Sequence, residues 1–244
     1  MSEEIKDNFE KGIFWELYLD LERQFLNFLE YVPYLPGNET VYSFKLLNLI
    51  LSIGGHIDSA FKEMARYPEF SNNIECQEIL KILRKSEKRK EEEKSPISVP
   101  IKLPLKAFEK EYRLSERRVI FKRLPNREEL VPFKIDNAKD SDTNMPEWWN
   151  IYNGLKHDVG INIVQANLQN TLNALAVAFL INVRHIPAAK RLCAYGILKG
   201  GIRTEEGYAK ARFDITPYIF EQILKSKQSH YPAFVETSIF VHFF

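Results

Sequence analysis

The sequence has few cysteines, no excess of either charge and no signal for export. Two cysteines among 244 residues, Cys76 and Cys193, form no CxxC pair, so a disulfide framework is excluded and a reducing cytoplasm is expected. The 34 basic and 33 acidic residues nearly cancel, so there is no global basic excess of the kind that marks a non-specific nucleic-acid binder. The acidic, polar start at 1–7 lacks the features of a signal peptide.

The longest uncharged stretch, 160–183, is also too polar to be a membrane span. It carries several amide side chains, and its continuous apolar part runs only from 174 to 181. A helix that crosses about 30 Å of hydrocarbon needs a far longer apolar run. We therefore expect a buried core helix over about 162–183 and no membrane segment. Because burying unpaired amides is costly, these side chains also favour a central position for this helix and a two-fold dimer near His157.

Familiar catalytic and cofactor motifs are absent. The chain has no GxxxxGK[ST] loop, no GxGxxG, no HExxH and no GxSxG. The five histidines show no metal-ligand spacing with cysteines or carboxylates, so neither a metal nor a cofactor is predicted. Cys193 fits a small residue in the core better than a nucleophile.

Apolar residues at three- and four-residue steps predict a mainly α-helical fold. Hydrophobic residues make up 45% of the chain, which is enough for a sizeable core. Proline, glycine and capping residues set the expected ends of the helices. The expected helices span 8–31, 43–66 (or from 40), 71–94, 145–160, 162–183, 187–198 and 217–224. The charged run 85–94 is interpreted as a solvated helix end or a linker, and Gly200-Gly201 as the stop of the helix that begins at Pro187.

Residues 95–145 differ from the rest. Five prolines exclude long helices there, and Val119–Phe121 with Leu130–Phe133 resemble a small hairpin. The β-rich tail 234–241 is a candidate partner for that hairpin, and most strand is expected in 95–145 and 234–243. The insert is locally basic, which fits either a plain exposed surface or a nucleic-acid patch. We expect one domain over 1–244, with 95–145 as an irregular or hairpin insert.

The segment 148–158 is the densest in functional side chains. On a helix, Trp149, Asn153 and Lys156 or His157 fall on one side. A histidine beside an amide can act in acid–base chemistry. Alternatively, the aromatics pack a core and His157 caps a helix end.

The order of these features resembles the HEPN superfamily of helical-bundle proteins, especially its uncharacterised prokaryotic branches. The matching segments are Leu21-Glu22-Arg23…Tyr31-Val32, Tyr42-Ser43…Ile57-Asp58…Lys62, the Trp-Trp-x-x-Tyr-Asn-x-x-Lys-His block at 148–157, and Asn167–Leu175. Many HEPN proteins are metal-independent ribonucleases of toxin–antitoxin and phage-defence systems. The resemblance therefore implies a helical bundle, a homodimer, a defence or stress-response role with RNA or a nucleotide bound, and an antitoxin-like protein as a candidate partner.

The resemblance also implies roles for individual residues. His157 matches the family histidine and would act in acid–base catalysis, and Asn153 matches the polar position. Tyr152 stands where the family has arginine, and a tyrosine cannot hold the phosphate as a cation. Lys156, Tyr152 and Trp149 would contact the ligand, with Asp58 and Lys62 supplied by the facing helix. The alternative is a degenerate, non-catalytic bundle that dimerises or binds a protein; a small-molecule hydrolase is less favoured because nucleophile motifs are missing.

Overall fold

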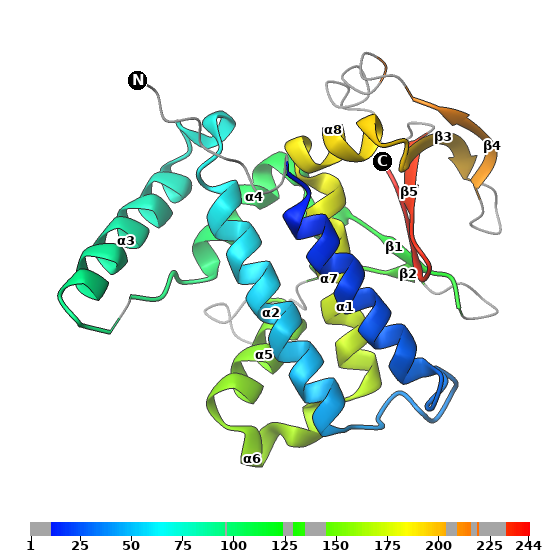
Figure 1. The fold of residues 1–244 in the computed structure, drawn as a ribbon, viewed down its shortest axis with the longest axis horizontal. Helices are drawn as coiled ribbons and strands as arrows, with labels where there is room; N and C mark the ends of the chain where they lie inside the picture. Colours follow the sequence, from blue (N-terminus) through cyan, green and yellow to red (C-terminus); the bar gives the residue numbers. More distant parts are fainter. Residues whose placement is uncertain are drawn as a thin grey trace.

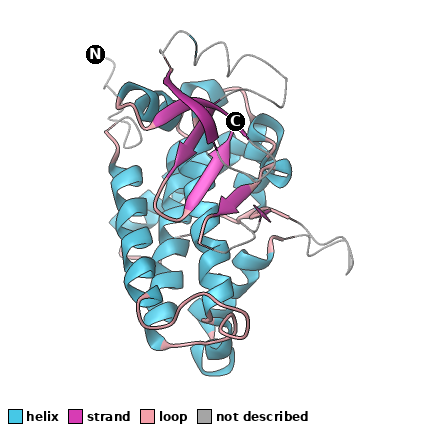
Figure 2. Cartoon of the chain, turned by 90° about the vertical axis from the view of Figure 1, so that its right-hand side faces the viewer, coloured by secondary structure: helices cyan, strands magenta, loops and turns pink. Residues whose placement is uncertain are grey.

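The computed structural model describes residues 11–95, 97–123, 129–134, 145–203, 209–215, 219 and 233–244. In these ranges the protein is mainly helical, with a small antiparallel sheet packed against one side of a helical bundle (Figures 1 and 2). The mainly helical fold predicted from the periodicity is confirmed.

The first two long helices lie where the apolar spacing predicts them. Helix α1 spans Ile13–Leu29 and α2 spans Phe44–Met64. The Ser43 hydroxyl accepts a hydrogen bond from the Leu46 N–H at 3.1 Å, and so caps the start of α2. Residues 8–10 of the first expected helix lie outside the described residues.

Helix α7, Leu168–Arg184, is the centre of the bundle. Almost every side chain from Leu168 to Val183 is buried, and α7 packs against α1, α2, α5 (Glu147–His157) and α8 (Ile186–Ala194). The predicted central helix is therefore present, but it starts later than 162. A short helix α6, Val159–Asn162, and a 3-10 turn, Ile163–Gln165, come first.

The amides of this region are paired inside the chain. The Asn167 side chain accepts from the Asn170 N–H at 2.9 Å, and the Asn170 amide donates to the Gln165 carbonyl at 2.9 Å. The Gln169 amide donates to Asn173 at 3.2 Å and accepts from the Tyr34 hydroxyl. These bonds pair Asn167, Gln169 and Asn170 within one chain, whereas the Oδ1 atom of Asn182 is buried without a partner among the described residues. The dimer stays a prediction.

Helices α3, Ile74–Glu91, and α4, Lys102–Tyr112, pack together as a pair beside the bundle (Figure 1). Asn73, not Ser71, caps α3: its side chain accepts from the Cys76 N–H at 2.9 Å. The charged run continues α3 as a solvated helix end. Helix α4, with 11 residues, corrects the expectation of an irregular or hairpin insert without long helices, because Pro104 falls in its first turn, where the missing N–H has no intrahelical role.

The six strands form one antiparallel sheet in the order β2-β1-β6-β5-β3-β4. Their bounds are β1 Val119–Phe121, β2 Glu129–Leu130, β3 Leu198–Arg203, β4 Ala209–Asp214, β5 Ala233–Glu236 and β6 Phe240–Phe243. The predicted hairpin is confirmed as β1–β2. Its predicted pairing with the C-terminal tail is confirmed too, since Ile120 pairs with Val241 and Phe121 with Phe240.

Strands β3 and β4 overturn two expectations. The helix expected over 187–198 ends at Ala194, and Gly200-Gly201 lies inside β3 instead of stopping a helix. The two longest strands therefore lie outside the segments where most strand was expected. The register of β3 against β4 shifts between Gly200 and Ile202. Glycine is common at such irregularities in a strand, and Gly201 lies there. The helix expected over 217–224 and the turn at 125–128 lie outside the described residues, apart from the single position 219.

Aromatic contacts and buried hydrogen bonds connect the sheet to the helical bundle. The Phe179 ring of α7 lies 5.5 Å from the Phe240 ring of β6 and 5.6 Å from the Tyr18 ring of α1. The buried Glu22 carboxylate accepts from the Tyr18 hydroxyl and from the Ser238 N–H, the latter at 3.0 Å. Helix α1 is thereby tied to the turn between β5 and β6.

Among the described helices, none is by itself long and apolar enough to cross a membrane. Helices α7 and α8 pass that test only as a pair, and they are bent by 78° relative to each other. The two cysteines are free and buried. Cys193 donates to the Ile215 carbonyl at 3.2 Å, as suits a small core residue.

Candidate functional site

Helix α5 carries the dense block that the sequence singles out. Pro146 precedes it, and Glu147 in its first turn complements the positive end of the helix dipole. One side of α5 is buried through Trp148, Tyr152 and Leu155. This spacing turns the opposite side of the helix, including His157, toward solvent.

Tyr152 docks α5 closely on α2. A Cβ atom added to Gly54 would lie 2.2 Å from the Tyr152 ring, far inside any real contact. Only a glycine therefore lets the ring approach the α2 backbone this closely. The neighbouring Gly55 has no atom within 4 Å of the same position. The close helix packing that the glycine pair indicates is present at Gly54 alone.

The two glycines give a matched test of this docking. Gly54→Ala should lower the free energy of unfolding, because overpacking costs about 1–3 kcal/mol and outweighs the gain in helix propensity. Gly55→Ala should raise it by up to about 1 kcal/mol, since helix propensity acts alone there. Urea unfolding of both variants measures the difference. Equal stabilisation by the two alanines would show that Tyr152 does not rest on Gly54.

Charged groups of both helices surround the Tyr152 ring. Asp58 and Lys62, one turn apart on α2, form a half-buried ion pair. The Lys156 ammonium lies 5.7 Å from the centroid of the Tyr152 ring. Burial raises the pKa of Tyr152, and the negative charge of Asp58 raises it further. Tyr152 is thus a neutral phenol with the Lys156 ammonium of α5 over its ring and the Asp58–Lys62 ion pair of α2 acting on it through Asp58.

Trp149 extends the aromatic surface. Its ring lies 5.3 Å from the Tyr152 ring and 5.6 Å from the Trp148 ring, and it is half-buried. Trp148 is buried against Phe133, so it belongs to the core. Of the two tryptophans, Trp149 is the one that reaches the surface beside the charged groups.

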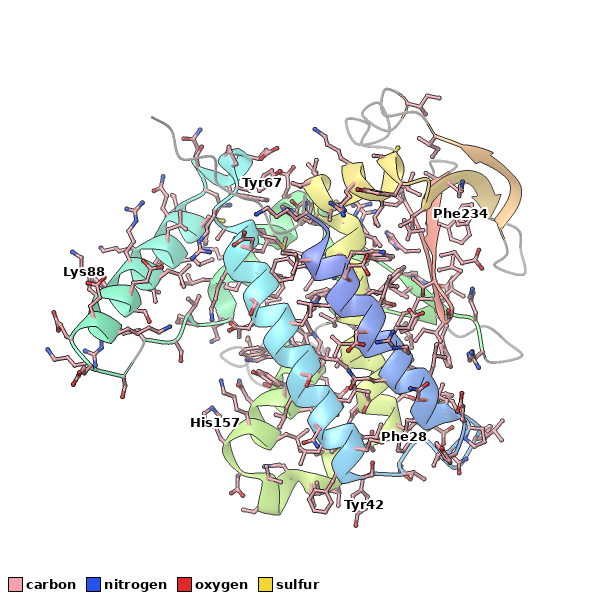
Figure 3. The ribbon with its side chains drawn as sticks, viewed as in Figure 1. Phe28, Tyr42, Tyr67, Lys88, His157 and Phe234 are labelled. Atoms are coloured by element: carbon pink, nitrogen blue, oxygen red, sulfur yellow. The ribbon has the colours of Figure 1, made fainter. Side chains whose placement is uncertain are left out.

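Asn153 and His157 lie one helical turn apart on α5. Asn153 is half-buried, whereas His157 is exposed at the last residue of the helix (Figure 3). In the part of the chain that the structure describes, neither side chain has a hydrogen-bond partner. His157 is therefore not packed against Trp148 and Trp149. Its ring remains accessible to a ligand from solvent.

The chain reverses sharply after His157. The Asn162 amide donates to the Gly154 carbonyl at 3.1 Å and to the Asp158 carbonyl at 2.8 Å. Asp158 in turn caps α6 by accepting from the Ile161 N–H at 3.3 Å. These bonds fix the turn between α5 and α6, with His157 as the last residue of α5. The sequence placed Asn162 at the start of a long helix, and its capping role was missed because it depends on this turn.

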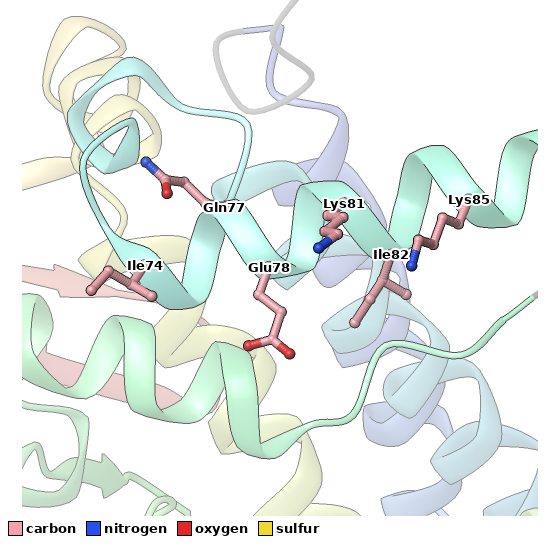
Figure 4. Close-up of a pocket in the computed structure, with 6 residues that line it drawn as sticks. All are labelled: Ile74, Gln77, Glu78, Lys81, Ile82 and Lys85. Atoms are coloured by element: carbon pink, nitrogen blue, oxygen red, sulfur yellow. The ribbon is translucent and has the colours of Figure 1, made fainter.

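A shallow pocket elsewhere contains none of the predicted site residues. It runs along α3 and combines two isoleucines with mixed charges (Figure 4). Its lining is Ile74, Gln77, Glu78, Lys81, Ile82 and Lys85. Across the described ranges, no three His, Cys, Asp or Glu side chains are grouped as metal ligands.

The predicted site residues thus form two adjoining sets. Asp58, Lys62, Tyr152 and Lys156 gather around one ring, with Trp149 against its edge, while Asn153 and His157 occupy the exposed side and end of α5. Comparison of the chain with protein-family models, curated proteins and solved structures gives no match.

Proposed function

We propose that the chain binds single-stranded RNA on the surface formed by α2 and α5, as a HEPN-like defence or stress-response protein. The observation that carries this proposal is the Tyr152 cluster, where Lys156 of α5 lies over the ring and Asp58 of α2, which is paired with Lys62, acts on the same tyrosine. Lysines attract the phosphates of a strand, and the half-buried Trp149 ring offers an aromatic surface for a base. A nucleotide offers the same two groups on a smaller scale.

Cleavage at this surface would be slow and independent of metal. Exposed His157 supplies the acid–base group, and Asn153 one turn away supplies an amide donor. Tyr152 cannot replace the family arginine, because its buried phenol carries no positive charge. The loss of one charge-assisted contact to the transition state costs about two to three decades in rate. Lys156 is the cation placed to substitute in part.

The test measures binding and cleavage of labelled single-stranded RNA in EDTA at several salt concentrations. Lys62→Gln and Lys156→Gln should each reduce the slope of log affinity against log salt by about 0.7, the effect of one lost phosphate contact. His157→Ala should abolish cleavage and leave binding nearly unchanged.

Lys45→Gln is the matched control, because Lys45 lies at the opposite end of the same helix α2, beside the Tyr31 ring. It should leave both slope and affinity unchanged. Absence of RNA binding at low salt, or an equal effect of the control, would refute the proposal.

A second candidate function is a non-catalytic interaction module. Four apolar side chains are exposed where the start of α2 meets the segment after α5: Tyr42 52%, Phe44 73%, Ile161 78% and Val164 49%. The two segments lie side by side, since the Ser43 N–H donates to the Ala166 carbonyl at 3.3 Å. Such a patch favours association with a protein, either an antitoxin-like partner or a second copy of the chain. A dimer in sedimentation that dissociates in Phe44→Ser, without RNA binding, would favour this function.

A further inference from the structure

A second group of basic side chains lies at the other end of α7, away from α5 (Figure 1). Arg184 ends α7, Arg117 precedes β1, and His242 lies in β6. The Phe244 ring lies 5.4 Å from the His242 ring and 5.1 Å from the Arg184 Cζ atom, and the His242 Nδ1 atom contacts the Arg118 carbonyl, next to Arg117. The fold therefore brings two arginines and a buried histidine from distant parts of the chain to one region, where Arg117 and Arg184 act on each other and on His242.

The carboxylates described near these arginines are few and do not pair with them. Within the described ranges, neither Arg117 nor Arg184 forms an ion pair with a carboxylate. The two acids nearest Arg117 are already engaged: Glu109 accepts from the Ser115 N–H at 2.9 Å, and Glu116 pairs with Arg113. Glu109 and Glu116 thus offset part of the charge of Arg117, whereas no described carboxylate acts on Arg184.

Arg184 holds its guanidinium in a largely enclosed place. Its Cζ atom lies 5.1 Å from the centroid of the Phe244 ring, and its Nε atom is buried without a hydrogen-bond partner in the described part of the chain. Burial and the nearby Arg117 lower the pKa of Arg184 to about 9. A buried, unpaired charge is unfavourable, so the folded chain gains when an anion meets this guanidinium.

The other groups also leave hydrogen-bonding capacity unused. The Nδ1 of His242 lies 2.8 Å from the Arg118 carbonyl, which can only accept, so Nδ1 carries the hydrogen. The Nε2 of His242 is buried and without a partner among the described residues. Arg117 donates from Nε to the Tyr112 carbonyl at 3.0 Å, which fixes the arginine and leaves its terminal nitrogens for another acceptor.

We propose that Arg117 and Arg184 form a binding site for a phosphate-type oxyanion, with His242 at its edge. Guanidinium groups match the geometry of phosphate oxygens and can bind them in pairs. Phosphate fits better than a single carboxylate because it brings close to two negative charges and more acceptor oxygens for two arginines. His242 is neutral near pH 7, because burial lowers its pKa to about 3, so its Nε2 atom can accept a hydrogen bond from a protonated oxygen of the phosphate. The site is independent of the RNA-binding surface proposed on α2 and α5.

Isothermal titration at fixed ionic strength tests this site, with inorganic phosphate and, separately, adenosine monophosphate as probes. Wild-type protein should bind phosphate at submillimolar concentration, and Arg184→Gln and Arg117→Gln should each weaken binding at least tenfold. Tighter binding of the nucleotide would identify the phosphate of a larger ligand as the target, and equal binding would identify free phosphate.

Arg118→Gln provides the matched control. Arg118 is adjacent in sequence and carries the same charge, but it is exposed and paired with Glu129 at 2.7 Å. Its substitution should leave phosphate affinity unchanged. No binding by folded wild-type protein, or an equal loss in Arg118→Gln, would overturn the proposal. If Arg184→Gln does not fold, Arg117→Gln decides alone, since its side chain is half-buried and lies outside the helices and strands.

Discussion

The free energy of unfolding should fall steeply as the pH drops below about 6. Burial lowers the pKa of His56 to about 4 and of His185 and His242 to about 3. Above the unfolded pKa of about 6.5 these side chains are neutral in both states, so the stability is fully present. Below about pH 6.5 the three histidines become protonated in the unfolded chain. In the folded chain they stay neutral until the pH approaches their lowered pKa values. Each histidine then costs about 1.4 kcal/mol per pH unit, and all three cost about 4.

This loss is large against a typical total stability of about 5–15 kcal/mol. Urea unfolding at pH 7.5, 6.5 and 5.5 measures it directly, and potentiometry should show uptake of nearly three protons on unfolding at pH 5.5. His56→Gln should remove about a third of the pH dependence. A free energy that stays constant from pH 7.5 to 5.5 would contradict the burial of these rings.

Replacing Phe179 by alanine should lower the free energy of unfolding by about 3–5 kcal/mol, the usual cost of deleting a buried aromatic ring. Phe179 is fully buried, and its ring meets Trp15 and Tyr18 of α1 and Phe240 of β6. Its removal would leave a cavity where bundle and sheet meet. Urea unfolding monitored by far-ultraviolet circular dichroism measures the loss.

Phe44→Ala is the control for that measurement. Phe44 is 73% exposed at the start of α2, so the same chemical change should alter stability by no more than about 0.5 kcal/mol. A second variant, Phe240→Leu, should cost less when Phe179 is already absent, because the two rings share one contact. Strict additivity of the two losses would show that they pack independently.

Much of the helical bundle could be predicted because its information is local. Apolar steps of three and four mark α1, α2 and α5, and Ser43 marks the start of α2. The interaction of Tyr152 with Asp58, in contrast, joins residues that are far apart in the sequence. That prediction followed from the family resemblance, while Gly54, the residue that permits the contact, carried only a general signal of close packing.

The failures arise where distant contacts override local preference. Gly200-Gly201 belongs to a strand because β3 is hydrogen-bonded to β5 on one side and β4 on the other. The group of Arg117, Arg184 and His242 was not predicted from the sequence for a similar reason. Its members are separated by long stretches of sequence, so no spacing pattern marks them, and only the assembled sheet brings them together.

The order of strands in the sheet also determines when the sheet can form during synthesis. Strand β1 has β6 as one of its two neighbours, and β6 leaves the ribosome long after β1. Until then the β1–β2 hairpin keeps an unpaired edge, and the face of α7 around Phe179 lacks its cover from Phe240. Such edges and apolar faces are where growing chains associate wrongly. Truncation before β6 should therefore yield a chain that aggregates or is held by chaperones, even though its helices are complete.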